Sequence, residues 1–234
     1  MRAIIMAGGR GERLKPYTTV IPKPLMPIGD IAILEFVILK LKKAGFDRVT
    51  ITLGYLGNLI EAYVGNGSRF GIPIDFIYEE KPLSTIGPLA FIEDLNETFI
   101  VMNGDILTDI DFNKLIEFHK KKRAKATIAT NKRLSKIDFG VLSFNGDRLI
   151  TGFIEKPEYN YDVSMGIYVF EPEVLEYVKK GIPYGLDSLV LDMIQNRDRI
   201  YSFEFDGYWL DIGRPDDYEK AIKMFTKIGK DSIQ

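Results

Sequence analysis

The sequence predicts an α/β protein with a doubly wound, Rossmann-like mixed sheet that is mostly parallel, with antiparallel strands added in the second half. Three observations support this fold class. The first is a short apolar run, residues 2–6, that ends in glycines, as a buried parallel strand does. The second is the alternation of strand-like and helical patterns up to residue 130. The third is Asn145-Gly146, a hairpin turn signal between two strand-like runs.

The first half of the chain alternates between the two periodicities of secondary structure. Short apolar runs predict strands, and apolar residues that recur at helical spacing predict helices. The strands are expected over residues 48–53, 74–78, 99–102 and 126–130, and the helices over 31–44, 58–64, 87–95 and 111–123. This order is typical of a doubly wound sheet, in which helices connect parallel strands.

The second half departs from this alternation after residue 139. The runs 141–144 and 148–155 flank the Asn-Gly turn and predict an antiparallel hairpin. Later helices are expected over 172–179, 185–195 and 215–227, two of them with proline at the first turn.

The helix expected over 111–123 accounts for the most basic segment of the chain. Asp111 is well placed as its N-cap, and the cations at 120–123 complement the dipole at its C-terminus. We therefore interpret this run as a solvated helix end and not as a targeting signal or a nucleic-acid patch. His119 is the only histidine, and its position among these lysines disfavours it as a catalytic base.

Composition excludes several classes of protein. The 234 residues are 46% hydrophobic and 27% charged, which is ordinary for a soluble globular chain. A net charge of −2 argues against nonspecific binding of nucleic acid. The chain has no cysteine, so disulfides and thiolate zinc sites are excluded. No run is apolar enough for a signal peptide or a membrane span, and we expect a cytoplasmic protein with small-molecule partners and neither nucleic acid nor membrane. The sequence does not determine the oligomeric state, and a homo-oligomer is one of the alternatives.

The loop after the first strand combines glycines with two cations. Gly8, Gly9 and Gly11 lack side chains, so several backbone N–H groups can approach an oxyanion. Arg13 adds a planar guanidinium for phosphate, and Lys23 adds a compact ammonium. This concentration of positive charge suits the phosphates of a nucleotide.

Two other glycine-rich motifs do not fit this loop. A dinucleotide fingerprint needs a glycine three residues after Gly11, where the chain has Leu14. A P-loop needs glycine before its lysine and serine or threonine after it, whereas Lys23 lies between prolines. The glycines alone are equally compatible with an ordinary strand-to-helix turn.

Two aspartates follow apolar runs at the expected edge of the sheet. Asp105 comes after the strand expected over 99–102, and Asp211 comes after residues 208–210. Ligands of doubly wound sheets bind at the carboxyl ends of the strands, so convergence of these carboxylates would create a magnesium site. Taken alone, each aspartate more simply closes a turn or caps a loop.

Together these motifs resemble the sugar-1-phosphate nucleotidyltransferases, also called NDP-sugar pyrophosphorylases. The segment from Gly8 to Leu25 fills every defined position of their signature, G-G-x-G-x-R-L-x-P-x-T-x-x-x-P-K-P-L. Similar segments follow in order at 103–105, 139–141, 154–157, 166–170 and 208–213. The resemblance implies the nucleotide-diphospho-sugar transferase fold in a single domain, residues 1–234, without the C-terminal β-helix extension of longer members.

The resemblance also implies the reaction. A sugar 1-phosphate would attack the α-phosphorus of a nucleoside triphosphate, giving an NDP-sugar and pyrophosphate, and catalysis would consist of alignment and charge stabilisation with Mg²⁺. The residues that it implies are Arg13, Lys23 and Asp105 for catalysis; Met6, Ala7, Gly8, Gly9, Gly11, Arg13, Lys23 and Gly87 for the nucleotide; Asp105 and Asp211 for the metal; and Gly140, Glu155, Lys156, Ser164 and Gly166 for the sugar phosphate.

Four residues depart from the family's usual motifs and leave the substrates open. Ser84 and Ile86 lie in the loop that would contact the base, and Ser164 and Met165 lie in a segment that the resemblance implies is near the sugar. The segments at 87–89 and 209–215 are most similar to mannose-1-phosphate guanylyltransferase-like members, so GTP with mannose 1-phosphate ranks first. A UTP- or dTTP-dependent glucose-1-phosphate enzyme is the alternative.

Two further classes remain as alternatives. The same departures are compatible with a non-catalytic subunit that senses sugar nucleotides. Asp109 and Asp111 form a D-x-D pair, by which many glycosyltransferases bind metal. The intact segment from Gly8 to Lys23 favours an enzyme that makes nucleotide sugars over both.

Overall fold

A seven-stranded sheet forms the centre of the molecule, and the computed structural model describes residues 1–228. Its strand order is β12-β8-β11-β6-β1-β4-β5. β11 is antiparallel to β6 and β8, and all other neighbouring pairs are parallel, so the predicted mixed sheet is confirmed. The strands are β1 (Arg2–Ala7), β4 (Arg48–Leu53), β5 (Ile74–Tyr78), β6 (Phe99–Asn103), β8 (Ala126–Lys136), β11 (Glu158–Phe170) and β12 (Ile200–Glu204).

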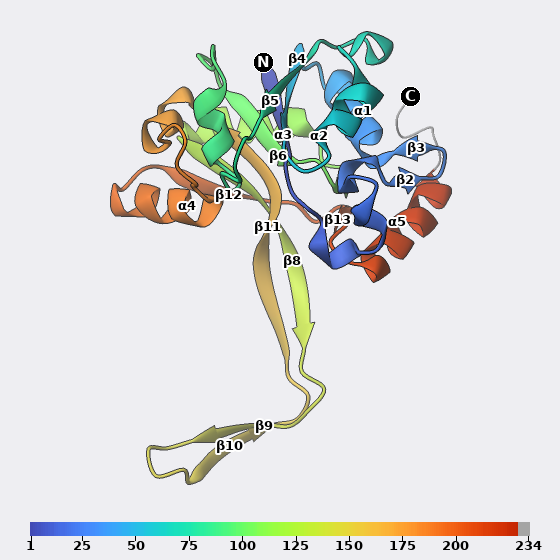
Figure 1. Cartoon of the computed structure of the whole chain (residues 1–234). Helices are drawn as coiled ribbons and strands as arrows, with labels where there is room; N and C mark the ends of the chain where they lie inside the picture. Colours follow the sequence, from blue (N-terminus) through green and yellow to red (C-terminus); the bar gives the residue numbers. More distant parts are fainter. Residues whose placement is uncertain (229–234) are drawn as a thin grey trace.

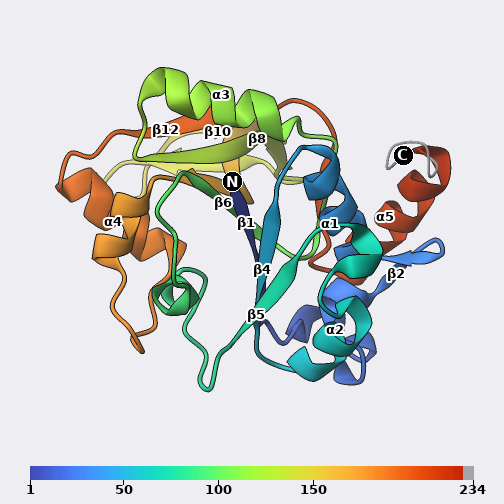
Figure 2. The same ribbon diagram turned by 90° about the horizontal axis from the view of Figure 1, so that it is seen from above.

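Helices lie on both sides of this sheet (Figures 1 and 2). α1, α2, α3 and α5 contribute to one apolar cluster, and α4 contributes to another. The helices are α1 (Ile33–Lys43), α2 (Gly57–Val64), α3 (Phe112–Lys122), α4 (Leu186–Gln195) and α5 (Pro215–Ile228). Each begins and ends close to a predicted helix, because each has a clear apolar stripe.

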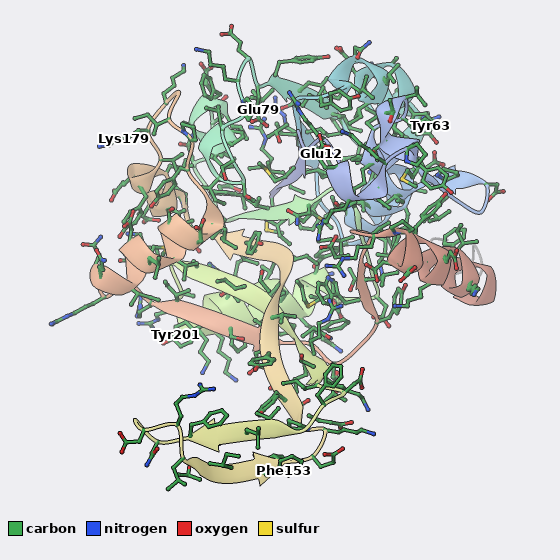
Figure 3. All side chains as sticks on the ribbon, turned by 60° about the horizontal axis from the view of Figure 1, so that its bottom comes forward. Glu12, Tyr63, Glu79, Phe153, Lys179 and Tyr201 are labelled. Atoms are coloured by element: carbon green, nitrogen blue, oxygen red, sulfur yellow. The ribbon has the colours of Figure 1, made fainter. Side chains whose placement is uncertain are left out.

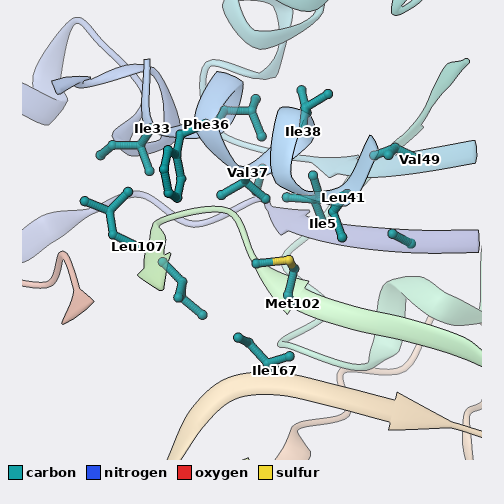
Figure 4. Packing of buried hydrophobic residues seen from close by; sticks show 14 of the residues in the cluster. Ile5, Ile33, Phe36, Val37, Ile38, Leu41, Val49, Met102, Leu107 and Ile167 are labelled. Atoms are coloured by element: carbon teal, nitrogen blue, oxygen red, sulfur yellow. The ribbon is translucent and has the colours of Figure 1, made fainter. Parts of the chain in front are cut away.

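Strand β1 shows why both faces are covered. Ile5 belongs to the cluster that contains α1, whereas Ile4 belongs to the cluster that contains α4, because successive side chains of a strand point to opposite faces. Figure 4 shows Ile5 and Met102 of the sheet close to Val37 and Leu41 of α1. Complete burial of such side chains contributes about 1.5–3 kcal/mol each, so the ends of these strands are firmly held.

Two predicted helices are wrong in type. Residues 87–95 form only the short 3₁₀ helix η5 (Gly87–Phe91), and residues 172–179 form η6 (Pro172–Tyr177). The residue after each, Ile92 and Val178, has an extended backbone, which ends each helix before an α-helical ladder develops. The remaining short elements are η1 (Glu12–Leu14), η2 (Tyr17–Thr19), η3 (Lys23–Leu25), β2 (Pro27–Ile28), β3 (Ile31–Ala32), η4 (Ser68–Phe70), β7 (Ile106–Thr108), β9 (Val141–Phe144), β10 (Ile150–Ile154) and β13 (Trp209–Asp211).

Strands β8 and β11 continue beyond the sheet as a two-stranded arm (Figure 1). Their pairing runs in regular register from Thr130 opposite Ser164 to Lys136 opposite Glu158. The predicted strand over 126–130 is therefore too short by six residues. The predicted hairpin, β9–β10, is present and forms the tip of the arm.

The arm leaves the sheet at its carboxyl edge. β8 is parallel to the rest of the sheet apart from β11, so it ends at the same edge as β1, β4 and β6. β13 pairs with β7 at this edge and places Asp211 opposite Ile106. No helix in the described part of the chain has the length and apolar character needed to cross a bilayer.

Candidate active site

A cavity of about 790 Å³ lies at the carboxyl edge of the sheet. The glycine loop after β1 forms one wall, and the segment after β5 forms another. Met6, Ala7, Gly8, Gly9 and Gly11, which the sequence predicts as nucleotide-binding, all line it. The local fold therefore brings the predicted phosphate loop into a concave site.

The glycines allow close approach of two strand ends. A Cβ atom at Gly8 would overlap Oε1 of Glu79, and a Cβ atom at Gly54 would lie 2.6 Å from the carbonyl oxygen of Gly8. Gly11 adopts a left-handed conformation, with φ of 62°, and so turns the chain into η1. Larger residues at these positions would push the loop away from the sheet.

Two guanidinium groups in the cavity are available to a ligand. Within residues 1–228, neither Arg10 nor Arg13 has a carboxylate at ion-pair distance, whereas Glu12 pairs with Lys15 at 2.5 Å. Arg13 lies against Gly213, where a Cβ atom would be 3.2 Å from its Nη2. Sequence reasoning assigned Arg13 to the phosphates but gave Arg10 no role of its own.

Lys23 lies between the two aspartates that the sequence singled out. Its Nζ forms an ion pair with Asp105 and lies 3.5 Å from Oδ1 of Asp211. The backbone N–H of Ile212 donates to the carbonyl of Asp105 at 3.2 Å, which fixes the two segments side by side. The expected convergence of the aspartates is found, and their role as metal ligands stays a prediction.

Two opposing effects act on the pKa of Asp105. Burial raises the pKa of its carboxyl, and the Lys23 ammonium opposes that shift. Its Oδ1 atom is buried and has no hydrogen-bond partner among the described residues. A buried acceptor of this kind calls for a donor or a cation.

The donor set fits Mg²⁺ if phosphate and water complete it. No group of three or more His, Cys, Asp or Glu side chains in the described residues could hold a metal. Mg²⁺ is commonly bound by one or two carboxylates together with substrate phosphates and waters. Asp105 and Asp211 supply that number.

Glu79, at the end of β5, is a site residue that sequence reasoning did not single out. It lines the cavity, and its Oε2 accepts a hydrogen bond from the backbone N–H of Leu83 at 3.0 Å. Burial raises the pKa of its carboxyl. The only signal in the sequence was its place at the start of the expected base-contacting loop. In that loop Ser84 and Thr85 line the cavity, whereas Gly87 is packed against residues 182–184.

The inner end of the arm adjoins the cavity through Asn103. Gly166 has a φ of 73°, and a Cβ atom there would lie 2.6 Å from Nδ2 of Asn103, which lines the cavity. Ser164 accepts a hydrogen bond from the N–H of Gly166 at 3.2 Å. Gly166 thus lies against a residue of the cavity wall, but neither Ser164 nor Gly166 lines the cavity, and their binding of the sugar phosphate stays a prediction.

Asp111 and the histidine have structural roles. Oδ1 of Asp111 accepts hydrogen bonds from the backbone of residues 113 and 114 at 3.0 and 3.2 Å, so the predicted N-cap of α3 is confirmed. His119 is buried between Thr127 and Glu171, at 2.8 and 3.0 Å, and burial lowers its pKa. Neither Asp109, Asp111 nor His119 lines the cavity.

The family model for the nucleotidyl transferases matches residues 2–228. The chain belongs to this family. The resemblance found in the sequence is therefore confirmed.

Relatives of this nucleotidyl transferase differ in their substrates. A UTP--glucose-1-phosphate uridylyltransferase from Synechocystis sp. is 34% identical over 95% of this chain and 63% of its own length. A mannose-1-phosphate guanylyltransferase catalytic subunit beta from Danio rerio is 32% identical over 97% of this chain and 65% of its own length. The chain therefore spans just under two thirds of these curated relatives.

Solved structures show the same architecture. HddC from Yersinia pseudotuberculosis has a TM-score of 0.74 and 27% identity, with 96% of this chain and 99% of that chain covered. A putative glucose-1-phosphate thymidylyltransferase from Bacillus anthracis has a TM-score of 0.79 and 25% identity, with 98% and 96% covered.

The nucleotidyl transferase body does not hold all the residues assigned to the sugar phosphate. Gly140, Glu155 and Lys156 lie at the tip of the arm, beside the hairpin, and none of them lines the cavity. Figure 3 shows Phe153 on the hairpin, whereas Glu12 and Glu79 lie on the body. A Cβ atom at Gly140 would be 2.5 Å from the ring of Phe153, so this glycine accommodates a neighbouring side chain. The sugar-binding roles of these residues stay predictions.

Proposed function

We propose that this chain catalyses nucleotidyl transfer from a nucleoside triphosphate to a sugar 1-phosphate, with Mg²⁺. The observation that carries the proposal is the pair of unpaired guanidinium groups, Arg10 and Arg13, in one cavity with Lys23 and its two aspartates. A triphosphate needs that concentration of cations, and the family membership gives the reaction class.

The reaction replaces one bond to the α-phosphorus with another. An oxygen of the sugar 1-phosphate forms a new bond to this phosphorus, the bond to the bridging oxygen of the β-phosphate breaks, and pyrophosphate leaves with the electron pair. The nucleophile is already anionic, so no general base is required. The protein has to align two anions and stabilise the charge that spreads between them.

Each cation has a task in that alignment. The glycine-loop N–H groups, Arg10 and Arg13 hold the β- and γ-phosphates, which become the leaving pyrophosphate. Lys23 stabilises charge at the α-phosphate. Asp105 and Asp211 would hold Mg²⁺, which supplies positive charge to the phosphates when bound.

Glu79 supports GTP as the nucleotide. Guanine presents two adjacent N–H donors on its Watson–Crick edge, N1–H and the N2 amino group, and an ionised carboxylate accepts both. Uracil and thymine present one N–H between two carbonyl oxygens, which a carboxylate would repel. Glu79 already accepts one backbone N–H and has acceptor capacity left.

Mannose 1-phosphate is the proposed sugar substrate, in line with the activity for which the Danio rerio relative is named. A UTP- or dTTP-dependent enzyme for glucose 1-phosphate is the second candidate, because other relatives carry those activities in their names. The intact set of cations and carboxylates disfavours a purely sensing subunit.

The test is pyrophosphate release with Mg²⁺ over a grid of GTP, UTP, dTTP, CTP and ATP against mannose, glucose, heptose and N-acetylglucosamine 1-phosphates. We expect release with GTP and mannose 1-phosphate, and its loss in Lys23→Ala with circular dichroism unchanged. Release with another pair of nucleotide and sugar 1-phosphate would reassign the substrates to that pair. If folded protein that binds a nucleotide sugar released no pyrophosphate with any substrate pair, the catalytic proposal would be refuted.

A further inference from the structure

The hairpin at the tip of the arm has an uncovered apolar face. Phe144 is opposite Ile150, and Leu142 is opposite Phe153, so the four side chains share one face of the two strands. They are 41–61% exposed. In Figure 1 the hairpin lies beyond the end of the arm, away from every helix of the body.

Such a hairpin needs a partner surface. A two-stranded hairpin alone is marginally stable in water, and it gains stability when its apolar face packs against something else. A contiguous apolar face on a folded protein marks an interaction site. We therefore expect the apolar face of the hairpin to pack against another protein surface.

The arm itself resists folding back onto its own body. Its two strands are paired without interruption from residues 130 and 164 to residues 136 and 158, and the outermost pair is joined by an ion pair between Lys136 and Glu158 at 2.5 Å. Six residue steps at about 3.3 Å each hold the hairpin about 20 Å beyond the body. Return to the same cavity would require this ladder to break, or the arm to bend at its base, where the register shifts between Ser164 and Tyr168.

The cavity is incomplete for two anionic substrates. Among the described residues, the cations that line it are Arg10, Arg13 and Lys23, which a triphosphate would occupy. Lys156 and Glu155, next to the hairpin, would add a cation and a hydroxyl acceptor. This step rests on the proposed function, because that function requires a sugar phosphate beside the nucleotide.

The rim, residues 14–22, joins two parts of the cavity wall and carries exposed apolar side chains. Tyr17, Val20 and Ile21 are exposed, and they lie in the segment that joins the glycine loop to Lys23. The arm and this rim lie at the same edge of the sheet. Two copies that face each other with this edge, related by a twofold axis, would each present an arm to the other's cavity.

We propose that two copies of this chain exchange arms, so that the hairpin of one copy docks on the rim of the other's cavity and supplies Glu155 and Lys156 to the sugar phosphate there. Each active site then consists of a body from one protomer and an arm tip from its partner. The exchange covers both hairpins at once and completes both sites.

Complementation between two inactive variants tests the exchange. Lys23→Ala removes a body residue, and Lys156→Ala removes an arm residue. In a co-expressed equal mixture, random pairing leaves one site in four with both lysines, so we expect about a quarter of wild-type pyrophosphate release. No gain over the two variants measured separately would overturn the proposal, and so would full activity of Lys156→Ala alone.

A second measurement separates this proposal from the proposed function. The wild-type chain should have the mass of a dimer in solution. Leu142→Ser/Ile150→Ser, on the hairpin face, should shift it to a monomer. The matched control is Leu191→Ser/Ile194→Ser on α4, where the two side chains are 60% and 59% exposed, and it should remain a dimer.

The outcomes are distinguishable. Wild-type activity without complementation would overturn the exchange and leave the function standing. A wild-type chain that is inactive with every substrate pair would refute the proposed function. The solution masses of the wild type and of the two double variants would still test whether the arms are exchanged. A monomeric wild-type chain, or dissociation of the α4 control as well, would overturn the exchange.

Discussion

Replacing Glu79 with glutamine should weaken the preference for GTP. In the proposed complex, the carboxylate accepts two N–H donors of guanine, whereas an amide offers one acceptor oxygen and turns N–H₂ toward the other donor. Hydrogen bonds to a charged group contribute about 1.5–3 kcal/mol in proteins. Loss of that amount corresponds to a fall of about 10- to 150-fold in kcat/KM for GTP.

The assay is steady-state pyrophosphate release with GTP and with UTP at a fixed concentration of mannose 1-phosphate. Glu79→Gln should lose rate with GTP and gain relative rate with UTP, because an amide pairs with the donor and one acceptor of uracil. Glu80→Gln is the matched control, since Glu80 also lines the cavity but is exposed. If Glu79→Gln kept its GTP rate within twofold, or if both variants fell equally, the assignment of Glu79 would be refuted.

The pH dependence gives the same prediction an independent readout. Burial raises the pKa of Glu79, while the N–H of Leu83 opposes that shift. The ionised form, which accepts guanine, is complete above this raised pKa and is lost as pH falls through it. The ratio of GTP to UTP rates should therefore decrease on acidification at a pH above the ordinary glutamate range. Glu79→Gln should show no such decrease.

Three further substitutions have defined outcomes. Asp105→Asn should reduce turnover at least about 100-fold and weaken the Mg²⁺ dependence, because it removes charge from a proposed ligand; a titration of rate against Mg²⁺ at unchanged circular dichroism checks this. Gly166→Ala should lower the melting temperature and the activity together, since its φ of 73° and its contact with Asn103 exclude a Cβ atom; an unchanged melting temperature would contradict this account. Asp111→Ala should cost about 0.5–2 kcal/mol of stability through loss of the α3 N-cap and leave kcat/KM unchanged, as urea unfolding and the pyrophosphate assay would show.

The sequence was sufficient where local chemistry decides the structure. The bounds of β5 and β9 are as predicted, because apolar runs between turn residues define them. Asp111 caps α3 as predicted, because a cap is a contact between near neighbours. The convergence of Asp105 and Asp211 was expected, but Asp211 reaches the site through β13, which pairs with β7 outside the main sheet, and the place of Lys23 between the two carboxylates was not foreseen.

Contacts between distant segments could not be predicted from the sequence. Glu79 belongs to the cavity because its carboxylate lies against Gly8, 71 positions earlier in the chain, and no periodicity encodes that approach. The extension of β8 past residue 130 depends on its pairing with β11. Residues 131–136 are mostly polar and read as a loop until their partner strand is known.

The arm explains why the proposed sites for the two substrates differ in how well they could be predicted. The nucleotide residues follow β1, β5 and β6, whose positions are fixed by a common core. Glu155 and Lys156 follow a hairpin whose own apolar face is uncovered, so their final position depends on what that face meets. If the face meets a second copy, the sugar phosphate can be held only when two chains associate. Activity per chain should then fall on dilution below the dimer dissociation constant, while binding of GTP to the body should persist, and a rate per chain that stays constant as the dimer dissociates would contradict this dependence.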